Sequence, residues 1–456
     1  MPALFAETAL LPSGWAERVR VDWDAAGTIT SVTPKTTQGS AERADALVPG
    51  MANLHCHSFQ RAMAGLTERA GPAGDDFWSW REVMYRFLAT LDPEQIGAIA
   101  AQLYVELLKS GYTAVAEFHY IHNDPAGRPY ADRAELANQI ALAAGATGIR
   151  LTLLPVLYQS GNFGGAAPSE AQRRFLLKTD AFNALVESLA KALRGSRAIR
   201  IGIAPHSLRA VPPAALREAK AAIDRLDASA PIHIHAAEQT KEVEACLAWS
   251  KKRPVEWLLD EMKPDRRWTL IHCTHMTPDE TLRLAASGAV AGLCPTTEAD
   301  LGDGLFPLID YLGAAGKFGV GSDSNVGVAP AEELRWLEYG HRLARRKRNL
   351  VPAEKGESIG AKLWRGALAG GAQALAQPIG AVAQGARADF LALDRNHPTL
   401  AGHAGDGILD ALVFAGGTAA IRHVMVGGRW VVRDGRHPAE ERVAENYRAA
   451  LRRLGA

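Results

Sequence analysis

Hydrophobic and polar positions alternate in two different ways along the middle of the chain. Short apolar runs rich in β-branched residues take turns with longer stretches whose apolar positions recur every three or four residues. The first pattern is typical of buried strands, and the second of helices with one buried face. Pro93–Lys109 is one such helical stretch, with apolar Ile96, Ile99, Leu103 and Leu107 in this rhythm. The middle of the chain is therefore expected to alternate strands with helices.

Eight strands are predicted in this region. They are expected at Ala46–Val48, Thr113–Phe118, Arg150–Val156, Arg200–Ala204, Ile232–His235, Trp268–Ile271, Ala289–Leu293 and Phe318–Gly321. Between them, helices are expected at Pro93–Lys109, Asp132–Ala144, Asp180–Leu193, Pro213–Leu226, Thr240–Leu247, Pro278–Ala285 and Ala331–Ala344. Because parallel strands need crossover helices, the alternation predicts an α/β fold with a parallel (β/α)8 TIM-like barrel. A doubly wound open sheet is the competing topology.

Both ends of the chain carry further strand-like runs separated by turn residues. These runs are Leu4–Leu10, Arg18–Trp23, Ile29–Thr33, Ala386–Leu393, Ala419–Met425 and Gly428–Arg433. Three short strands cannot bury a core alone, so we expect the two ends to combine in one small β-sandwich. The predicted domains are residues 1–48 and 376–456 for the two parts of the sandwich, and residues 49–375 for the barrel.

Composition and charge exclude several functions for these 456 residues. The chain is 47% hydrophobic and 22% charged, which rules out global disorder. Its 51 basic and 50 acidic residues give a formal net charge of +1, a poor basis for nucleic-acid binding. No apolar run reaches the roughly 18 residues of a membrane span, and acidic Glu7 argues against a secretion signal. The four cysteines form no C-x-x-C pair, so a reducing cytoplasm is expected.

A pair of histidines follows the first predicted barrel strand. In extended backbone His55 and His57 point the same way, so both imidazoles can reach one cation while Cys56 points away. The carboxyl ends of barrel strands form the face where active sites are built. Taken alone, this pair also fits a surface or core position.

Later predicted strands end in residues of similar chemistry. His233 and His235 lie in the fifth strand, where one of them can face the barrel axis, and Glu238 follows three residues after His235. His272 ends the sixth strand and Asp323 follows the eighth. A lone aspartate in a Gly/Ser loop is more often a turn residue. The joint occurrence of these residues at four strand ends nevertheless indicates one site.

The residue types at this site favour a metal ion. Three imidazoles and one carboxylate suit a zinc ion that keeps one position open for water, although iron or manganese could occupy the same ligands. A carboxylate such as Glu238 beside that water could move protons. The fourth predicted strand ends in Ala204-Pro205-His206 without a lysine that could bridge two metals. We therefore expect one metal ion per chain.

This ordered pattern resembles the amidohydrolase superfamily across nearly the whole chain. Within it, the chain is similar to the formimidoylglutamate deiminase family in the segments Leu54–Gly65, Phe77–Arg81, Ala116–Tyr120 and Ala204–Arg209. The resemblance implies zinc-dependent hydrolysis of N-formimidoyl-L-glutamate to N-formyl-L-glutamate and ammonia, a step of histidine degradation. It also implies a homodimer.

The resemblance assigns roles residue by residue. It implies that zinc is bound by His55, His57, His235 and Asp323. It implies that Glu238 shuttles protons, with His272 and Asp323 as its catalytic partners. It implies that the substrate is held by Gln60, Arg81, Tyr120, His206 and Arg209. Planar guanidinium groups pair well with carboxylates, so the two arginines suit a substrate that carries two of them.

Three other functions remain open at this stage. One is a mononuclear deaminase acting on a nucleobase-like or triazine ring, whose pocket would need aromatic stacking more than two arginines. Another is a dinuclear hydrolase of cyclic amides, which the missing lysine disfavours. The third is a non-catalytic metal-binding scaffold, which would not need Glu238, His272 and Asp323 together.

Overall fold

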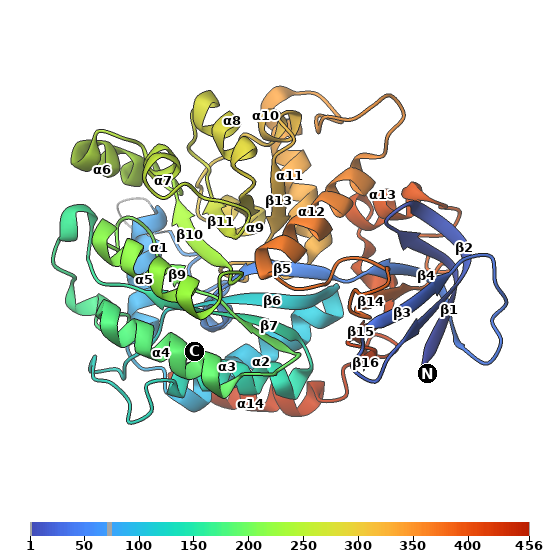
Figure 1. Cartoon of the computed structure of the whole chain (residues 1–456), viewed down its shortest axis with the longest axis horizontal. Helices are drawn as coiled ribbons and strands as arrows, with labels where there is room; N and C mark the ends of the chain where they lie inside the picture. Colours follow the sequence, from blue (N-terminus) through green and yellow to red (C-terminus); the bar gives the residue numbers. More distant parts are fainter. Residues whose placement is uncertain (1, 71–74, 456) are drawn as a thin grey trace.

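Two arrays of strands lie side by side in the computed structural model, which describes residues 2–70 and 75–455 (Figure 1). The first array is a seven-stranded sheet in the order β16-β15-β14-β4-β1-β2-β3. Its strands are β1 Ala3–Leu11, β2 Gly14–Trp23, β3 Ile29–Thr33, β4 Glu42–Pro49, β14 Phe390–Leu393, β15 Ile421–Val426 and β16 Arg429–Val432. The expected β domain built from both ends of the chain is confirmed.

The second array is the parallel barrel. Its strands are β5 Met51–Cys56, β6 Tyr112–His119, β7 Arg150–Leu157, β8 Ile199–Ile201, β9 Ala204–Pro205, β10 Ile232–Ala236, β11 Trp268–His272, β12 Val290–Leu293 and β13 Lys317–Val320. Strands β8 and β9 both pair with β7 and together occupy the fourth position. Parallel bridges from Ile203 to Ile232 and from Cys56 to Asp323 join the two halves. This closure excludes the open-sheet alternative.

The prediction for the first barrel strand was wrong. Ala46–Val48 belongs to β4, where Ala46 pairs with Thr8 of β1 and with Leu393 of β14. The barrel begins one strand later, at β5. Only Gly50 separates β4 from β5, and a Cβ atom there would overlap the Thr113 side chain. The chain therefore passes from one sheet to the other in a single residue that has to be small.

Helices alternate with the barrel strands. They are α1 Phe77–Leu88, α2 Pro93–Ser110, α3 Glu135–Thr147, α4 Thr179–Ala192, α5 Pro213–Leu226, α6 Thr240–Ser250, α7 Pro254–Glu261, α8 Pro278–Ser287, α9 Pro295–Asp300, α10 Leu308–Gly313, α11 Pro330–Arg345, α12 Ile359–Leu375, α13 Asp406–Phe414 and α14 Glu440–Leu454. Short 3-10 turns lie at η1 Ser58–Met63, η2 Phe163–Gly165, η3 Glu170–Gln172 and η4 Gly417–Ala420. Each of the seven predicted helices overlaps an observed one.

Local sequence explains where these helices begin and end. In α2, the Asp92 side chain caps the Gln95 N–H, Pro93 takes the first turn, and Gly111 ends the helix in left-handed backbone at φ 106°. Two helices of the C-terminal segment pack against helices of the barrel. Helix α13 packs on α12, and α14 packs on α2. None of the described helices is long and apolar enough to cross a membrane.

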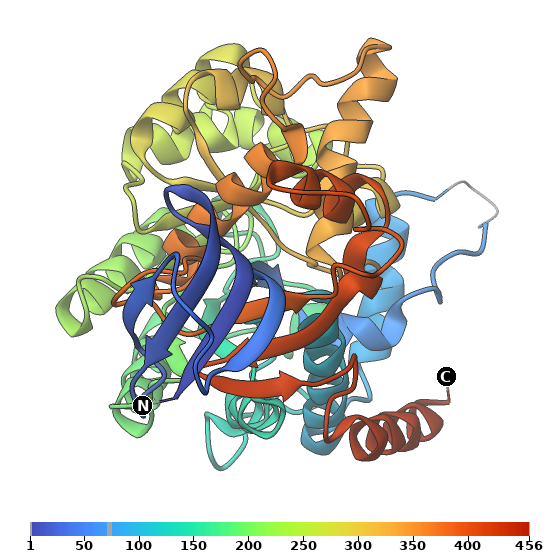
Figure 2. The ribbon, with the colours of Figure 1, turned by 90° about the vertical axis from the view of Figure 1, so that its right-hand side faces the viewer.

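The terminal sheet folds over a core of its own. Thr28 bridges antiparallel to Arg387, so the turn between β2 and β3 meets the segment that leads into β14. Trp23, Phe390 and Met425 pack in this core, which is separate from that of the barrel. Figure 2 shows the N-terminal strands in blue beside the C-terminal strands in red. The two ends of the chain thus hold each other in place next to the barrel.

Candidate active site

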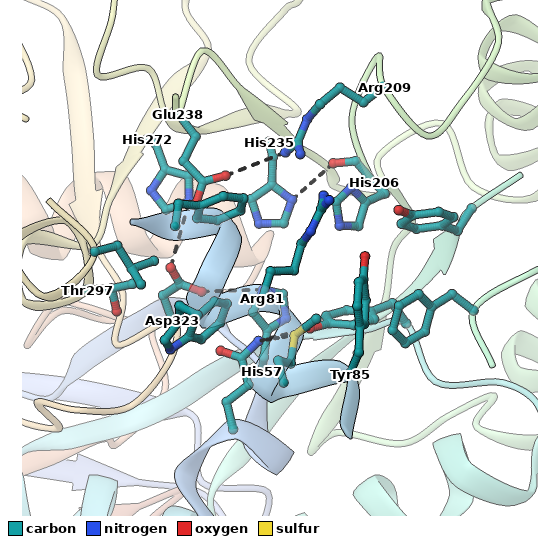
Figure 3. A pocket seen from close by; sticks show the side chains of 18 residues that line it. His57, Arg81, Tyr85, His206, Arg209, His235, Glu238, His272, Thr297 and Asp323 are labelled. Atoms are coloured by element: carbon teal, nitrogen blue, oxygen red, sulfur yellow. Dashed lines mark hydrogen bonds and ion pairs between the residues drawn. The ribbon is translucent and has the colours of Figure 1, made fainter. Parts of the chain in front are cut away.

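Three histidines and one aspartate converge at the carboxyl end of the barrel. His55 and His57 lie at the end of β5, His235 lies in β10, and Asp323 follows β13. Figure 3 shows His57, His235 and Asp323. The Nε2 atoms of His55 and His235 are 3.0 Å apart. Asp323 Oδ1 lies 3.5 Å from His55 Nε2 and 3.4 Å from His57 Nε2. The structure therefore gathers side chains from three strands that are far apart in sequence.

Backbone carbonyls fix the orientation of two of these rings. His57 Nδ1 lies 3.0 Å from Phe118 O, and His235 Nδ1 lies 3.0 Å from His206 O. A carbonyl only accepts hydrogen bonds, so each Nδ1 must carry the proton. In the neutral rings each Nε2 is then left with a lone pair that faces the centre of the cluster.

Burial keeps the three imidazoles neutral. It lowers the pKa of His55 to about 3 despite the opposing effect of Asp323, and it lowers the pKa of His57 and His235 as well. Burial alone would raise the pKa of Asp323, but its hydrogen bond to His55 and the neighbouring histidines hold that pKa below the usual range. The cluster thus presents neutral nitrogen donors and an ionised carboxylate.

This donor set fits a divalent cation. Lone pairs on neighbouring Nε2 atoms repel one another unless a proton or a cation lies between them, and metal ligation requires deprotonated donors of this kind. The ligand atoms of His55, His57 and His235 all lie within 4.8 Å of one another, as do those of His55, His272 and Asp323. Three nitrogens and one oxygen are also the donors that zinc takes in sites with an open position.

Two further polar residues face this cluster. His272 Nε2 lies 3.7 Å from Glu238 Oε1 and 3.7 Å from Asp323 Oδ2. Burial raises the pKa of Glu238, while the charges of His272 and Arg209 oppose that rise. Burial would lower the pKa of His272, but Glu238, Glu298 and Asp323 outweigh it and raise that pKa to about 10. A carboxyl group and an imidazole therefore lie beside the cluster, where protons can move between them.

Unusual backbone places these side chains. Positive φ, between 44° and 68°, occurs at or within a few residues of the ends of barrel strands, at Ala237, His272, Cys273, Asp323 and Asn325. Non-glycine residues seldom adopt this region, and such strain concentrates at functional sites. Asn325 stabilises the turn because its Nδ2 donates to both His57 O and Asp323 O at 2.9 Å.

One pocket collects the side chains that the sequence singled out. Its lining includes His57, Gln60, Arg81, Tyr120, His206, Arg209, His235, Glu238, His272 and Asp323. His55 is fully buried behind this lining, with its ring in contact with that of His57. Gln60 Nε2 donates to Tyr120 Oη at 2.9 Å, so these two residues form one wall. The pocket encloses about 580 Å³ of space, part of it open to solvent.

The two arginines in the pocket differ in their surroundings. Arg209 is buried, with Nη2 at 3.6 Å from Glu238 Oε2 and Nε at 3.9 Å from Glu242 Oε2. Arg81 lies over the Trp78 ring, with Cζ 4.3 Å from its centroid, and its buried Nε has no hydrogen-bond partner. Within residues 2–70 and 75–455, Arg81 forms no ion pair with a carboxylate. The pocket therefore presents a cation that still lacks a counter-charge.

Sequence reasoning missed two residues that contact this site. Glu298 Oε1 lies 3.2 Å from His272 Nδ1, and Asn325 ties the end of β5 to the end of β13. Both lie in loops or short helices, and no spacing in the sequence links Glu298 to a histidine 26 positions away. Only the fold reveals these contacts.

Comparison with known proteins agrees with the barrel and its strand-end residues. Residues 46–431 match the Amidohydrolase family, and the chain belongs to this family. It is therefore a hydrolase of a family whose members use metal ions. Residues 1–46 match a further model described as the N-terminal domain of formimidoylglutamate deiminase HutF.

Comparison with individual proteins shows which members of the family the chain resembles. The chain is 54% identical to the formimidoylglutamate deiminase of Pseudomonas aeruginosa, with 100% of both chains covered. An amidohydrolase of Brucella melitensis of known structure has 48% identity and a TM-score of 0.94, again over 100% of both chains. An adenosine deaminase of Xanthomonas campestris, solved with bound zinc, has 20% identity and a TM-score of 0.82 over 99% of this chain and 98% of that one, which shows the fold alone.

Proposed function

We propose that this chain hydrolyses N-formimidoyl-L-glutamate to N-formyl-L-glutamate and ammonia, using one zinc ion per chain. The observation that carries the proposal is the combination of the imidazole–carboxylate cluster with the unpaired Arg81 in one pocket. The relative at 54% identity, named a formimidoylglutamate deiminase, supports the same reaction. This assignment would place the chain in histidine degradation.

The ligands proposed for the metal are His55, His57, His235 and Asp323. Their Nε2 lone pairs and carboxylate oxygens already point at a common centre, which supports this set. A zinc ion bound there would lower the pKa of a water molecule toward about 7 and supply a nucleophile at neutral pH. Cys56 is not proposed as a ligand, because its thiol lies 3.5 Å from Asn325 Oδ1 and burial raises its pKa well above the usual value.

Glu238 is proposed to carry the proton between the two halves of the reaction. Together with Asp323, it accepts a proton from the attacking water, and it then delivers a proton to the formimidoyl nitrogen that leaves as ammonia. The raised pKa of Glu238 suits a group that must both take and release a proton near neutral pH. The carbon–nitrogen bond to the leaving ammonia breaks, and the nitrogen attached to the glutamate carbon keeps the formyl group.

His272 is proposed to stabilise charge on the reacting group. Its Nε2 faces the space between Glu238 and Asp323, where the tetrahedral carbon would form. A donor aimed at charge that develops only in the transition state lowers the barrier without tightening ground-state binding.

The substrate's carboxylates are proposed to pair with Arg81 and Arg209, with Gln60, Tyr120 and His206 completing the contacts. A dianion would supply the counter-charge that Arg81 lacks. Burial of Arg209 strengthens its attraction for an anion, because water screens it little. A neutral nucleobase or triazine ring would leave the Arg81 guanidinium without an anionic partner, whereas Arg209 already lies beside Glu238 and Glu242.

Ammonia release tests this proposal. Zinc-loaded and chelator-stripped protein would be compared on N-formimidoyl-L-glutamate, guanine and cytosine, and reloading with iron or manganese would follow. We expect release from the first compound alone, lost on stripping and restored by metal. The variant Glu238→Gln should lose it, while Glu244→Gln on the exposed side of α6 should keep it. Release from a nucleobase alone, or equal turnover after stripping, would refute the proposal.

Two properties stay predictions from the sequence. A homodimer is expected and would be tested by light scattering on the purified protein. A cytoplasmic location is expected and would be tested by cell fractionation.

A further inference from the structure

A buried carboxylate that the proposed mechanism does not use lies behind His272. Glu298 sits in the first turns of the short helix α9, which follows β12. Its side chain is only 4% exposed. The carboxylate folds back so that Oε1 accepts the Cys294 N–H at 2.9 Å and also lies 3.2 Å from His272 Nδ1.

We propose that Glu298 is a positioning residue that fixes the His272 ring, with Nδ1–H held by Glu298 and Nε2 turned to the reacting group. This inference rests on the proposed function of the same site. An ionised carboxylate accepts hydrogen bonds and donates none, so it binds the proton on Nδ1 whether or not Nε2 is protonated as well. The nitrogen left for the substrate is then Nε2.

The other contacts of His272 do not determine which edge of its ring faces the pocket. His272 is the last residue of β11 and has φ at 68°, so the chain turns away from the strand direction at this residue. The His235 ring stacks on it at 5.5 Å with an interplanar angle of 15°, which restrains its tilt but not which edge faces the pocket. Among the described residues, its Nε2 has polar contacts of 3.7 Å to Glu238 and Asp323, longer than a hydrogen bond. The bond to Glu298 is therefore the one that sets which edge points inward.

The backbone in turn holds Glu298. One oxygen, Oε1, receives both the Cys294 N–H and the imidazole, so the turn that begins α9 also locates the carboxylate. A glutamate at this place could serve merely as a cap for α9. The two roles differ in what they predict, because a cap affects folding alone, whereas a positioning group changes turnover at unchanged substrate affinity.

A second buried carboxylate, which contacts α9 from another helix, offers a matched control. Glu333 of α11 is also buried, and its carboxylate accepts the Thr296 N–H at 2.9 Å and the Thr296 hydroxyl at 2.6 Å. It anchors α9 through Thr296, and within the described residues it has no hydrogen bond or ion pair to a residue that lines the pocket. Glu333→Gln thus perturbs the same helix without changing the support of His272.

Steady-state kinetics on the zinc-loaded protein tests the proposal. We expect Glu298→Ala to lower kcat about 100-fold, the scale of one placed acid or base group, with KM unchanged. Glu298→Gln keeps an acceptor oxygen but loses the charge, so it should recover part of this loss. Zinc content should stay at the wild-type level, and Glu333→Gln should keep the wild-type kcat. A wild-type kcat in Glu298→Ala, or an equal loss in Glu333→Gln, would overturn the proposal.

Proton NMR of protein labelled at histidine nitrogens gives a readout that needs no substrate. The wild-type protein and Glu333→Gln should show a downfield His272 Nδ1 proton, identified by its loss in His272→Asn. The signal should move upfield in Glu298→Gln and vanish in Glu298→Ala, and its persistence in Glu298→Ala would overturn the proposal even where that variant is impaired in folding. If the wild-type protein released no ammonia from the proposed substrate, the reaction would be wrong while this signal still decided the role of Glu298.

Discussion

The Nε2 atoms of His55 and His235 lie 3.0 Å apart, closer than two nitrogen lone pairs tolerate in the absence of a proton or a cation between them. His235 has its own proton on Nδ1, facing His206 O. His55 Nδ1 has no hydrogen-bond partner, so the one proton of a neutral His55 ring can lie on Nε2 and bridge to His235. The fold thus holds these two rings so that either one shared proton or a metal ion can lie between their Nε2 atoms.

Metal binding should be lost on substitution of His235 in β10 and kept on substitution of His233 in the same strand. His235→Ala removes an inward lone pair, so bound metal should fall to background after dialysis. His233 lies two residues earlier, and its Nε2 is 2.8 Å from Ala374 O. His233→Ala should lower the melting temperature and keep the metal. Elemental analysis per chain, with melting curves, checks both, and full metal content in His235→Ala would contradict the proposed ligand set.

Substrate affinity should depend on Arg81 more than on other cations of α1. Its guanidinium has no carboxylate partner in the described part of the chain and lies over Trp78. Losing a hydrogen bond between charged groups costs about 1.5–3 kcal/mol, so Arg81→Ala should raise KM by about 10–100-fold. Arg86→Ala, on the exposed side of the same helix, should leave KM unchanged. Kinetics with both variants decide whether Arg81 belongs to the substrate site.

Strand-end chemistry was predictable from the sequence because it depends on order and spacing alone. Parallel strands deliver their carboxyl ends to one face, so His57, His235 and Asp323 could be grouped before any distance was known. The boundary at the first strand was not predictable. The last four residues of β4 and all of β5 are buried and are separated only by Gly50, and no periodicity tells which of them enters the barrel.

Contacts made across loops also escaped prediction. Glu298 reaches His272 because α9 is a short turn that folds its side chain back on Cys294. Asn325 reaches His57 O through a backbone turn with φ at 64°. Such partners depend on where a loop lies in space, and neither charge nor hydropathy encodes that position.

Stability should depend on pH through Glu117, a buried carboxylate that accepts hydrogen bonds from the N–H and hydroxyl groups of Ser58, next to His57. Burial raises its pKa from 4.5 to about 7, although hydrogen bonds from Ser58 oppose this rise. The folded protein therefore binds this proton more tightly than the unfolded chain. The resulting stabilisation is present below pH 4.5 and is lost as the pH rises to about 7, a change of about 3 kcal/mol.

The variant Glu117→Gln isolates this contribution. It stays uncharged at every pH and should keep its stability where the wild-type protein loses it. In denaturant unfolding at pH 5 and pH 8, the free energy of unfolding of the variant should increase relative to that of the wild-type protein at the higher pH. Glu187→Gln, an exposed carboxylate on α4, should run parallel to the wild-type protein. Parallel curves for Glu117→Gln would show that Glu117 is ionised throughout this range.

The same substitution should have opposite effects in two helices. Gly370 lies in α12 against β13, and a Cβ atom there would overlap Phe318 O. Backbone cannot move aside as a flexible side chain can, so Gly370→Ala should destabilise the fold by about 3 kcal/mol. Gly145 lies exposed in α3 with nothing near its Cβ position. Gly145→Ala should stabilise the fold by about 0.5–1 kcal/mol, because alanine loses less backbone entropy in a helix.

The Gly370→Ala substitution should also weaken metal binding, because β13 leads to Asp323. A displaced β13 moves Asp323 away from His55 and His57, which lie 3.5 Å and 3.4 Å from its Oδ1. We therefore expect zinc affinity to fall in Gly370→Ala and to stay at the wild-type value in Gly145→Ala. Urea unfolding and competition with a chelator measure the two effects on the same samples. A stability loss without weaker zinc binding would mean that Asp323 is held by the Asn325 turn and not by the packing of α12 on β13.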